Sequence, residues 1–239
     1  MNYKVIIPVR LNSTRLPRKP LKDINGKTLL ERVVEQVKKS KANSIHVATD
    51  SEEISELCDQ IEVNSILTSK DHETGTDRVF ETCTKLKLDD DEVILNVQGD
   101  EPFIDPNDID NLAYLSHSSK ANIATLYTKL TDDEFHDRNV VKLWVESSNK
   151  ISDFSRDIDH LIPDQAKKHL GIYAYRYEFL KSFVNWDQSA NELSRNLEQM
   201  RALDNGQPIF GFEAVGKIHL GVDTQLDLEK AIEIAKNLK

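Results

Sequence analysis

Short apolar stretches alternate with stretches of helical periodicity along almost the whole chain, and this alternation limits the folds open to it. Strands are predicted over 5–7, 45–49, 64–68, 92–97, 121–128, 139–146, 169–176 and 208–214. Helices are predicted from Leu29, after Asp50, over 76–86, from Pro106, around 191–204 and after Thr224. This order is typical of an open, mostly parallel α/β sheet. Because the 239 residues contain no linker or repeat, we predict a single domain over residues 1–239.

Several helix starts carry capping signals that support these boundaries. Thr28 and Glu31 stand three residues apart, as in a capping box, and Thr224 and Asp227 repeat that spacing. Asp50 is predicted to cap the second helix, because its carboxylate would accept a hydrogen bond from a free backbone amide.

The composition argues against several classes of partner. Lys and Arg total 31 and Asp and Glu total 41, so the net charge of −10 disfavours general binding to nucleic acid or to a membrane surface. No apolar run approaches the roughly 20 residues that span a bilayer. Cys58 and Cys83 form no CxxC pair, which predicts small packed residues rather than a disulfide framework or a zinc site. We expect a soluble, cytoplasmic protein.

The loop after the first strand concentrates positive charge in an otherwise acidic chain. Arg10, Arg15, Arg18 and Lys19 occur with no carboxylate before Asp23. These cations would repel one another unless an anion lay among them. The loop after the first strand of an α/β sheet is also where such folds hold phosphates. The sequence therefore favours a phosphate-binding loop, with a solvated basic loop as the alternative.

Two carboxylates are candidate ligands of Mg²⁺. Asp100 follows the most apolar strand, at the sheet edge where open α/β folds bind ligands. Asp223 directly precedes the last helix, and because Thr224 is the better cap, Asp223 remains free to bind a metal. Magnesium takes oxygen ligands, usually one or two carboxylates plus substrate phosphates. The alternatives are an acidic turn at Asp100 and a helix cap at Asp223.

Other polar segments are less specific. Residues 71–78 are predicted to form a capped helix start; the alternative is a ligand site, where Gly75 would let a ligand approach the backbone and Arg78 would reach an anion. The segment 197–201 is predicted to lie on a solvated helix face. A half-solvated sheet face or a sugar pocket is predicted from alternating residues of one strand: His169, Gly171, Tyr173 and Tyr175. The absence of GxGxxG after the first strand, GxxxxGK[ST], GxSxG and HExxH disfavours Rossmann dinucleotide, P-loop, serine-hydrolase and zinc-protease chemistry.

Together these segments resemble the 3-deoxy-manno-octulosonate cytidylyltransferases, or CMP-Kdo synthetases. The resemblance rests on IIPVRLNSTRLPRKPL (6–21), VATD (47–50), DHETGTDR (71–78), NVQGDEP (96–102), HLGIYAYR (169–176), LEQMR (197–201) and GVDT (221–224), in the family's order and spacing. It implies a three-layer, Rossmann-like sheet of the nucleotide-diphospho-sugar transferase type. It also implies transfer of CMP from CTP to the anomeric hydroxyl of 3-deoxy-manno-octulosonate (Kdo), giving CMP-Kdo and pyrophosphate for lipopolysaccharide biosynthesis, with Mg²⁺ and as a homodimer.

The resemblance also assigns roles to residues that match the family's motifs. CTP would contact Pro8, Val9, Arg10, Ser13, Arg15, Lys19, Gly75 and Gln98. Asp100 and Asp223 would bind the metal and, with Lys19 and Arg10, form the catalytic set. The sugar would contact Arg78, Gln98, Arg156, His169, Tyr173, Glu198 and Gln199. The anomeric hydroxyl would attack the α-phosphorus while the metal and the cations neutralise charge, and no side-chain base is evident.

The chain departs from the family at a few positions. Arg18 stands where the family usually has glycine, Asp157 and Asp159 fall in a segment that is typically Ala-Pro-Ile-Pro, and Arg195 replaces a glutamate. Extra carboxylates near the sugar would repel the carboxylate of Kdo but suit an ammonium group. The substrate alternatives are therefore 8-amino-3,8-dideoxy-manno-octulosonate or another keto sugar acid, such as a sialic acid. A catalytically silent nucleotide-binding relative is a further alternative, which the two metal carboxylates disfavour.

Overall fold

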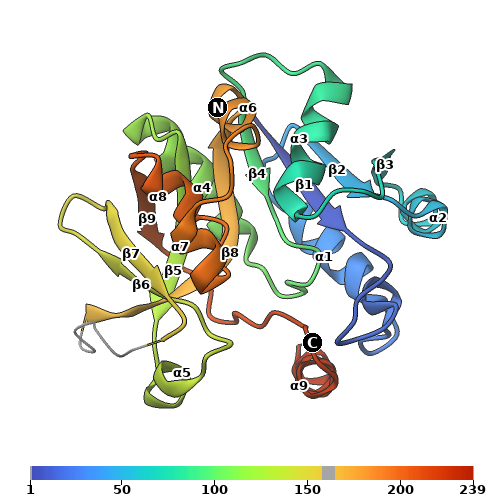
Figure 1. Cartoon of the computed structure of the whole chain (residues 1–239). Coiled ribbons are helices and arrows are strands. Elements are labelled where there is room, and N and C mark those ends of the chain that lie inside the picture. Colours follow the sequence, from blue (N-terminus) through green and yellow to red (C-terminus); the bar gives the residue numbers. More distant parts are fainter. Residues whose placement is uncertain (1, 158–164, 239) are drawn as a thin grey trace.

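A computed structural model describes residues 2–157 and 165–238 of the chain (Figure 1). The strands are β1 (Tyr3–Val9), β2 (Ser44–Thr49), β3 (Asn64–Leu67), β4 (Val93–Asn96), β5 (Ile123–Lys129), β6 (Lys142–Val145), β7 (Ile151–Ser155), β8 (Lys167–Arg176) and β9 (Ile209–Glu213). The helices are the short 3-10 helix η1 (Lys19–Leu21), α1 (Leu29–Val37), α2 (Glu52–Gln60), α3 (Gly75–Leu86), α4 (Pro106–Ser119), α5 (Asp132–His136), α6 (Tyr177–Phe183), α7 (Ala190–Arg195), α8 (Met200–Asp204) and α9 (Gln225–Asn237). Within the two described ranges, no helix has the length and apolar character needed to cross a membrane.

The strands form one open sheet in the order β3-β2-β1-β4-β8-β5-β9, and the hairpin of β6 and β7 extends from β8. β1 pairs in parallel with β2 and β4, and β5 pairs in parallel with β9. β8 runs antiparallel to both of its neighbours, β4 and β5. The prediction of an open, mostly parallel sheet is confirmed, but the pattern of apolar residues did not reveal the antiparallel strand in its middle.

Both faces of the sheet are covered, which gives the three-layer arrangement. Val5 and Ile7 of β1 pack in a core with α1, α2 and α4, whereas Ile6 packs on the opposite face with α3 and α6. Strands buried on both faces read as continuous apolar runs, as β1 and β4 do. Cys58 lies in the first core and Cys83 in the second, and both are unpaired, so the prediction of packed cysteines is confirmed.

A third, smaller core attaches α9 to the loop after β1. Leu228 of α9 packs with Leu16 and Ile24 of that loop and with Phe103, which follows β4. Figure 1 shows α9 below the sheet, apart from the helices of the two main faces. The apolar side of this loop is therefore fixed by the last helix, which leaves its charged side chains free to face elsewhere.

Most of the predicted helix starts are confirmed, and one is wrong. The capping boxes of Thr28 with Glu31 and of Thr224 with Asp227 are both formed. The helix after β2 is capped by the Ser51 side chain and not by Asp50. Asp50 instead accepts a hydrogen bond of 2.9 Å from Arg78 of α3.

The predicted helix around 191–204 is also wrong. The chain forms two short helices, α7 and α8, because Asn196 adopts a left-handed backbone with φ of 54° and ends α7. Asparagine is one of the residues that commonly end a helix in this way. The strand β7 and the helices α5 and α6 were not predicted, and each is short.

Arg18 also has a left-handed backbone, with φ of 55° and ψ of 36°. Its side chain forms an ion pair with Glu53 of α2 and so turns away from the neighbouring cations of the loop. A glycine would adopt this backbone without steric cost. The arginine adds strain to the loop and directs its charge to the outer surface.

We predict that Arg18→Gly is more stable than Arg18→Ala by about 1 kcal/mol. Both variants lose the exposed ion pair with Glu53, but only glycine relieves the left-handed backbone. Chemical denaturation of the two variants measures the difference in free energy of unfolding. Equal stability would show that the backbone at this position carries no strain.

Candidate active site

A hollow of about 400 Å³ lies at the carboxyl ends of β1 and β4. Its walls come from the loop after β1, the start of α3, the turn after β4 and the segment before α9. The lining residues are Pro8, Val9, Arg10, Asn12, Ser13, Thr14, Arg15, Lys19, Pro20, Gly75, Arg78, Gln98, Gly99, Asp100 and Asp223. Open α/β sheets bind ligands at this edge, so the hollow is the candidate active site.

Gly99 lets the turn after β4 lie directly against β1. A Cβ atom at this position would lie 2.7 Å from Cγ2 of Val9 and 3.2 Å from the carbonyl oxygen of Pro8. A side chain would therefore push the turn outward and carry Asp100 with it. The backbone amide of Val222 donates to the carbonyl of Asp100 at 2.9 Å, which joins this turn to the segment before α9.

Lys19 links the two candidate metal carboxylates. Its Nζ lies 2.7 Å from Oδ2 of Asp100 and 2.9 Å from Oδ1 of Asp223, and its side chain is 16% exposed. Burial lowers the pKa of Lys19, but the two carboxylates outweigh burial, and the net shift is upward. Burial likewise raises the pKa of Asp223, but Lys19 and Arg15 outweigh it and the net shift is downward. Both groups are therefore charged at neutral pH.

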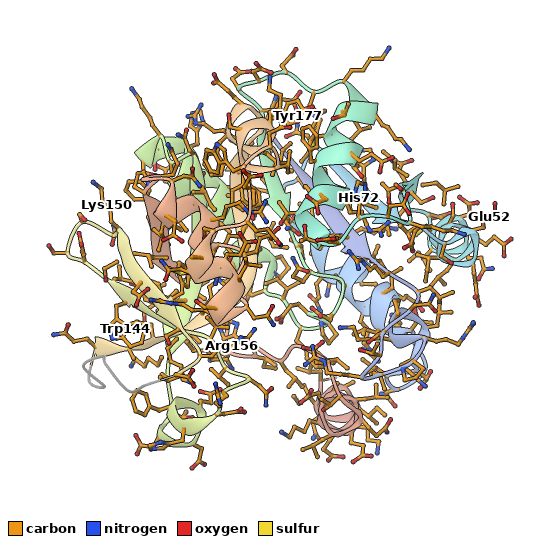
Figure 2. All side chains as sticks on the ribbon, in the orientation of Figure 1. Glu52, His72, Trp144, Lys150, Arg156 and Tyr177 are labelled. Atoms are coloured by element: carbon orange, nitrogen blue, oxygen red, sulfur yellow. The ribbon has the colours of Figure 1, made fainter. Side chains whose placement is uncertain are left out.

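The other cations of the β1 loop divide into two groups. Arg15 forms an ion pair of 2.9 Å with Oδ2 of Asp223, and Arg10 donates to the backbone carbonyl of His72. Figure 2 shows His72 beside the start of α3, so Arg10 reaches across the hollow to that wall. Arg18 is directed to α2 instead. Three of the four predicted cations thus face the hollow.

The structure brings all the residues predicted to bind the nucleotide into this one hollow. They are Pro8, Val9, Arg10, Ser13, Arg15, Lys19, Gly75 and Gln98. Of the residues predicted to bind the sugar, Arg78 and Gln98 line it too. Arg78 is fully buried, and its guanidinium donates to Oδ2 of Asp50 at 2.9 Å and to Thr68. The predicted anion-binding residue therefore already has partners within the protein.

The remaining residues predicted to bind the sugar form a second group beside the hollow. They are Arg156 after β7, His169 and Tyr173 on β8, and Glu198 and Gln199 between α7 and α8. The rings of His169 and Tyr173 lie 5.4 Å apart, and Glu198 accepts a hydrogen bond of 2.6 Å from Thr76 at the start of α3. In Figure 2, Arg156 lies at the end of the β6–β7 hairpin opposite its turn at Lys150. The two groups meet at Gln98, which lines the hollow and also lies against β8. A Cβ atom on Gly171 of β8 would lie 3.7 Å from Cγ of Gln98.

The prediction of a solvated helix face at 197–201 is wrong. The chain turns inward after α7, and Gln199 and Arg201 are only 8% and 5% exposed. The Arg201 guanidinium forms two hydrogen bonds with Glu192 and lies over the Phe183 ring at 4.8 Å. This buried ion pair anchors the turn that carries Glu198.

The prediction of a half-solvated face on β8 is wrong as well. Tyr173 is 9% exposed and Tyr175 is 2% exposed. Their rings stack with centroids 5.7 Å apart, and Tyr175 in turn stacks on Phe179 of α6. The aromatic residues of β8 therefore belong to the core below the site.

The family departures on described residues have partners within the protein. Both carboxylate oxygens of Asp157 pair with Arg138, at 2.8 Å and 3.0 Å. Arg195 donates to Oδ1 of Asp153 at 2.5 Å and to the carbonyl of Phe154 at 2.7 Å. Asp159 lies outside the described residues. Asp157 thus offers no uncompensated negative charge to a ligand.

Several residues of the site were not predicted from the sequence. Asn12, Thr14 and Pro20 line the hollow, and Asn96 supports it from within the sheet, where it is 1% exposed and accepts a hydrogen bond from Gln98. Asn96 could have been identified from the sequence, because a buried amide in an otherwise apolar strand needs hydrogen-bond partners. The three loop residues have no such signal, since polar loop residues are common.

His169 has a strongly shifted pKa. Burial and, to a smaller extent, the charge of Arg156 lower the pKa of this imidazole to about 3. Its Nε2 lies 3.1 Å from Oγ1 of Thr125, and its ring meets Phe154 edge to face. His169 is therefore a neutral hydrogen-bonding group at physiological pH and not a cation.

We predict that His169 makes the free energy of unfolding fall as the pH drops below about 6.5, the usual pKa of histidine in an unfolded chain. The unfolded chain binds a proton there that the folded protein does not accept until about pH 3, so acid favours unfolding. The slope from this residue is at most about 1.4 kcal/mol per pH unit. Chemical denaturation at pH 7.5 and 5.0 measures it.

The matched control uses a histidine on the surface. His169→Gln should reduce the pH dependence of stability, whereas His117→Gln should leave it unchanged, because His117 is exposed. An unchanged slope in His169→Gln would contradict the buried neutral imidazole.

The chain is similar to a described protein family and to several named proteins. Residues 4–234 match a family model described as cytidylyltransferase. A 3-deoxy-manno-octulosonate cytidylyltransferase of Polynucleobacter asymbioticus is 42% identical over 99% of this chain and 96% of its own length. A protein of Actinobacillus pleuropneumoniae named 3-deoxy-manno-octulosonate cytidylyltransferase 2 is 41% identical over 99% of this chain and all of its own length.

Two solved structures show the same fold. A CMP:2-keto-3-deoxy-manno-octonic acid synthetase complexed with CTP superposes with a TM-score of 0.92 and 32% identity, covering 99% of both chains. A putative glucose-1-phosphate thymidylyltransferase of Bacillus anthracis, in complex with a sucrose, superposes with a TM-score of 0.73 and 16% identity, covering 99% of this chain and 96% of its own. The second likeness concerns the fold alone.

Proposed function

The chain belongs to the cytidylyltransferase family, and from this membership we propose that it transfers CMP from CTP to Kdo and releases pyrophosphate. The observation that carries the proposal is the meeting, in one hollow, of a basic loop and two carboxylates from distant parts of the chain. A triphosphate needs cations for its charge, and a metal-assisted transfer needs carboxylates beside it. The relatives named as Kdo cytidylyltransferases support the choice of both substrates.

The two carboxylates fit a divalent cation. One oxygen of Asp100 and one of Asp223 lie within 3 Å of the Lys19 ammonium, so they already converge on a single positive charge. Among the described residues, no cluster of three or more His, Cys, Asp or Glu is placed to hold a metal. Phosphate oxygens and water would therefore complete the coordination of Mg²⁺. Bound there, the ion would neutralise charge on the α-phosphate and favour ionisation of the attacking hydroxyl.

The residues of the hollow would act mainly by holding and neutralising the triphosphate. Arg10, Arg15 and Lys19 line it, and their charges would stabilise the departing pyrophosphate. Lys19 and Arg15 would exchange the carboxylate oxygens they now contact for phosphate oxygens. Pro8, Val9 and Gly75 would border the nucleoside. We assign no side-chain general base.

The described charges favour Kdo over its 8-amino analogue. Asp157 is paired with Arg138, so it supplies no free carboxylate for an ammonium group. Arg156 lies close enough to His169 to lower its pKa, which places a cation in the second group of site residues. A sugar carboxylate would be attracted to this cation.

The family resemblance alone supports three further parts of the proposal. We propose that the protein acts as a homodimer, that it works in the cytoplasm, and that its product serves lipopolysaccharide biosynthesis. Analytical ultracentrifugation tests the first of these directly.

We predict that pyrophosphate release from CTP and Mg²⁺ is faster with Kdo than with 8-amino-Kdo or N-acetylneuraminate. The physical reason is that Arg156 supplies a cation near the predicted sugar residues, whereas Asp157 is already paired with Arg138. Steady-state release with each sugar measures the preference. A faster reaction with the amino sugar would contradict this assignment, and binding of CTP without release from any sugar would favour the silent-relative alternative.

We predict that Asp100→Asn lowers the rate of pyrophosphate release by about 100-fold or more, in the range typical for the loss of one electrostatic group from an active site. The amide keeps the size of the side chain but removes the charge that would hold the metal. Circular dichroism should show an unchanged fold. The matched control is Asp91→Asn on the exposed surface, which should react at the wild-type rate. A near-normal rate for Asp100→Asn would remove Asp100 from the metal site.

A further inference from the structure

The first turn of α3 has a fixed position beside the hollow. Thr74 and Asp77 form a capping box there, in which each side chain accepts a hydrogen bond from the backbone amide of the other residue. A Cβ atom on Gly75 would lie 3.5 Å from Cγ of Pro8, so this turn packs against β1. Thr76 follows Gly75 and is only 3% exposed, which leaves its side chain little freedom.

The hydroxyl group of Thr76 contacts a residue from a distant part of the chain. Its Oγ1 donates a hydrogen bond of 2.6 Å to Oε2 of Glu198, which lies 122 positions away in sequence. Hydrogen bonds from a hydroxyl to a carboxylate at this distance are among the stronger ones in proteins. Gly75 lines the hollow, and Glu198 belongs to the second group of site residues. The bond therefore joins the nucleotide region to the predicted sugar region.

The neighbouring cation Arg201 does not take the place of Thr76. Its guanidinium donates to both carboxylate oxygens of Glu192, at 2.8 Å and 2.5 Å. The distance from Arg201 to Oε1 of Glu198 is 4.0 Å, which is too long for a hydrogen bond although the charges still attract. Within the two described ranges, Oε1 of Glu198 is buried and has no hydrogen-bond partner. Thr76 is therefore the close donor that sets the direction of this carboxylate.

Loss of the Thr76 hydroxyl would change the position of Glu198. The carboxylate would lose its donor at 2.6 Å, while its other oxygen already lacks a partner. A poorly paired carboxylate is costly in a mostly buried position. Because the Glu198 side chain is 28% exposed, it has room to turn toward water or toward Arg201. The present direction of the carboxylate thus depends on one hydroxyl group.

We propose that Thr76 is a positioning residue, whose hydroxyl group holds the Glu198 carboxylate in the direction that sugar binding requires. The inference rests on the proposed function and deepens it, because it names a residue outside the predicted contacts that sets the affinity for the sugar. A carboxylate only accepts hydrogen bonds, so Glu198 held in this way favours hydroxyl groups of the sugar over its carboxylate. Nucleotide binding is affected little, since Thr76 is not one of the described residues that line the hollow.

The test compares Thr76→Val with Thr76→Ser in steady-state pyrophosphate release. Valine keeps the branched shape and removes the hydroxyl, whereas serine keeps the hydroxyl and removes the methyl group. Thr76→Val should raise the KM for Kdo by about tenfold, the lower end of what one hydrogen bond to a charged group contributes, and leave the KM for CTP unchanged. Thr76→Ser should restore most of the affinity for Kdo.

A kinetic double-mutant cycle with Glu198 separates this role from a general structural one. Glu198→Met removes the carboxylate at similar length and should raise the KM for Kdo at least as much. In that background, Thr76→Val should raise it no further, because its effect passes through Glu198. The control is Thr82→Val, which removes another buried hydroxyl of α3, one that donates to the carbonyl of Arg78 at 2.9 Å. It should leave both KM values unchanged.

Several kinetic results would overturn the proposal. One is a wild-type KM for Kdo in Thr76→Val. Another is an equal rise of this KM in the wild-type and Glu198→Met backgrounds, which would show a general structural role. A rise that Thr76→Ser does not reverse would show that the methyl group matters and not the hydroxyl.

A second readout needs no substrate and separates this inference from the proposed function. Chemical denaturation gives the free energy of unfolding of Thr76→Val, Glu198→Met and the double variant. The double variant should lose less stability than the sum of the two single losses, because either change alone already removes the shared hydrogen bond. Additive losses would overturn the contact even if the enzyme turns over CTP and Kdo. Coupled losses in a protein that releases no pyrophosphate would keep the contact and reject the proposed substrates.

Discussion

The contact of Lys19 with Asp100 and Asp223 holds together three parts of the chain that are far apart in sequence. Asp100 lies 81 residues from Lys19, and Asp223 lies 204 residues from it. Each of the three side chains is only partly exposed, so removing one charge would leave the others poorly paired in a half-buried site. The position of the basic loop therefore depends on the two carboxylates, and the positions of the two carboxylates depend on the basic loop.

Apolar packing makes this arrangement of charges possible. The third core fixes the β1 loop against α9 through Leu16, Ile24 and Leu228. The bare backbone of Gly99 lets the next turn approach β1 closely. Charged side chains would not gather at one point without this support, because like charges repel and burial is costly. Helix α9, which completes the small core, begins just after Asp223. It therefore both fixes the β1 loop and positions one of the two carboxylates.

The sequence predicted the alternation of strands and helices well, because apolar periodicity and capping residues are local signals. It did not predict that β8 runs antiparallel, since the partner of a strand is set by distant residues. The break at Asn196 was missed because the residues around it remain compatible with a helix. The grouping of the nucleotide residues followed from the family resemblance, whereas the inward turn that buries Arg201 depends on its partner Glu192, which no spacing rule identifies.

The pairing of β4 with β8 has a consequence for how two substrates would meet. Asn96, next to Gln98 of the hollow, lies directly opposite Tyr173, which is predicted to contact the sugar. Neighbouring strands are held about 5 Å apart by their backbone hydrogen bonds. The floors of the two binding regions are therefore parts of one rigid ladder and not of two movable lobes. The sheet itself would therefore set the distance between the two substrates, and only the loops above it would have to move.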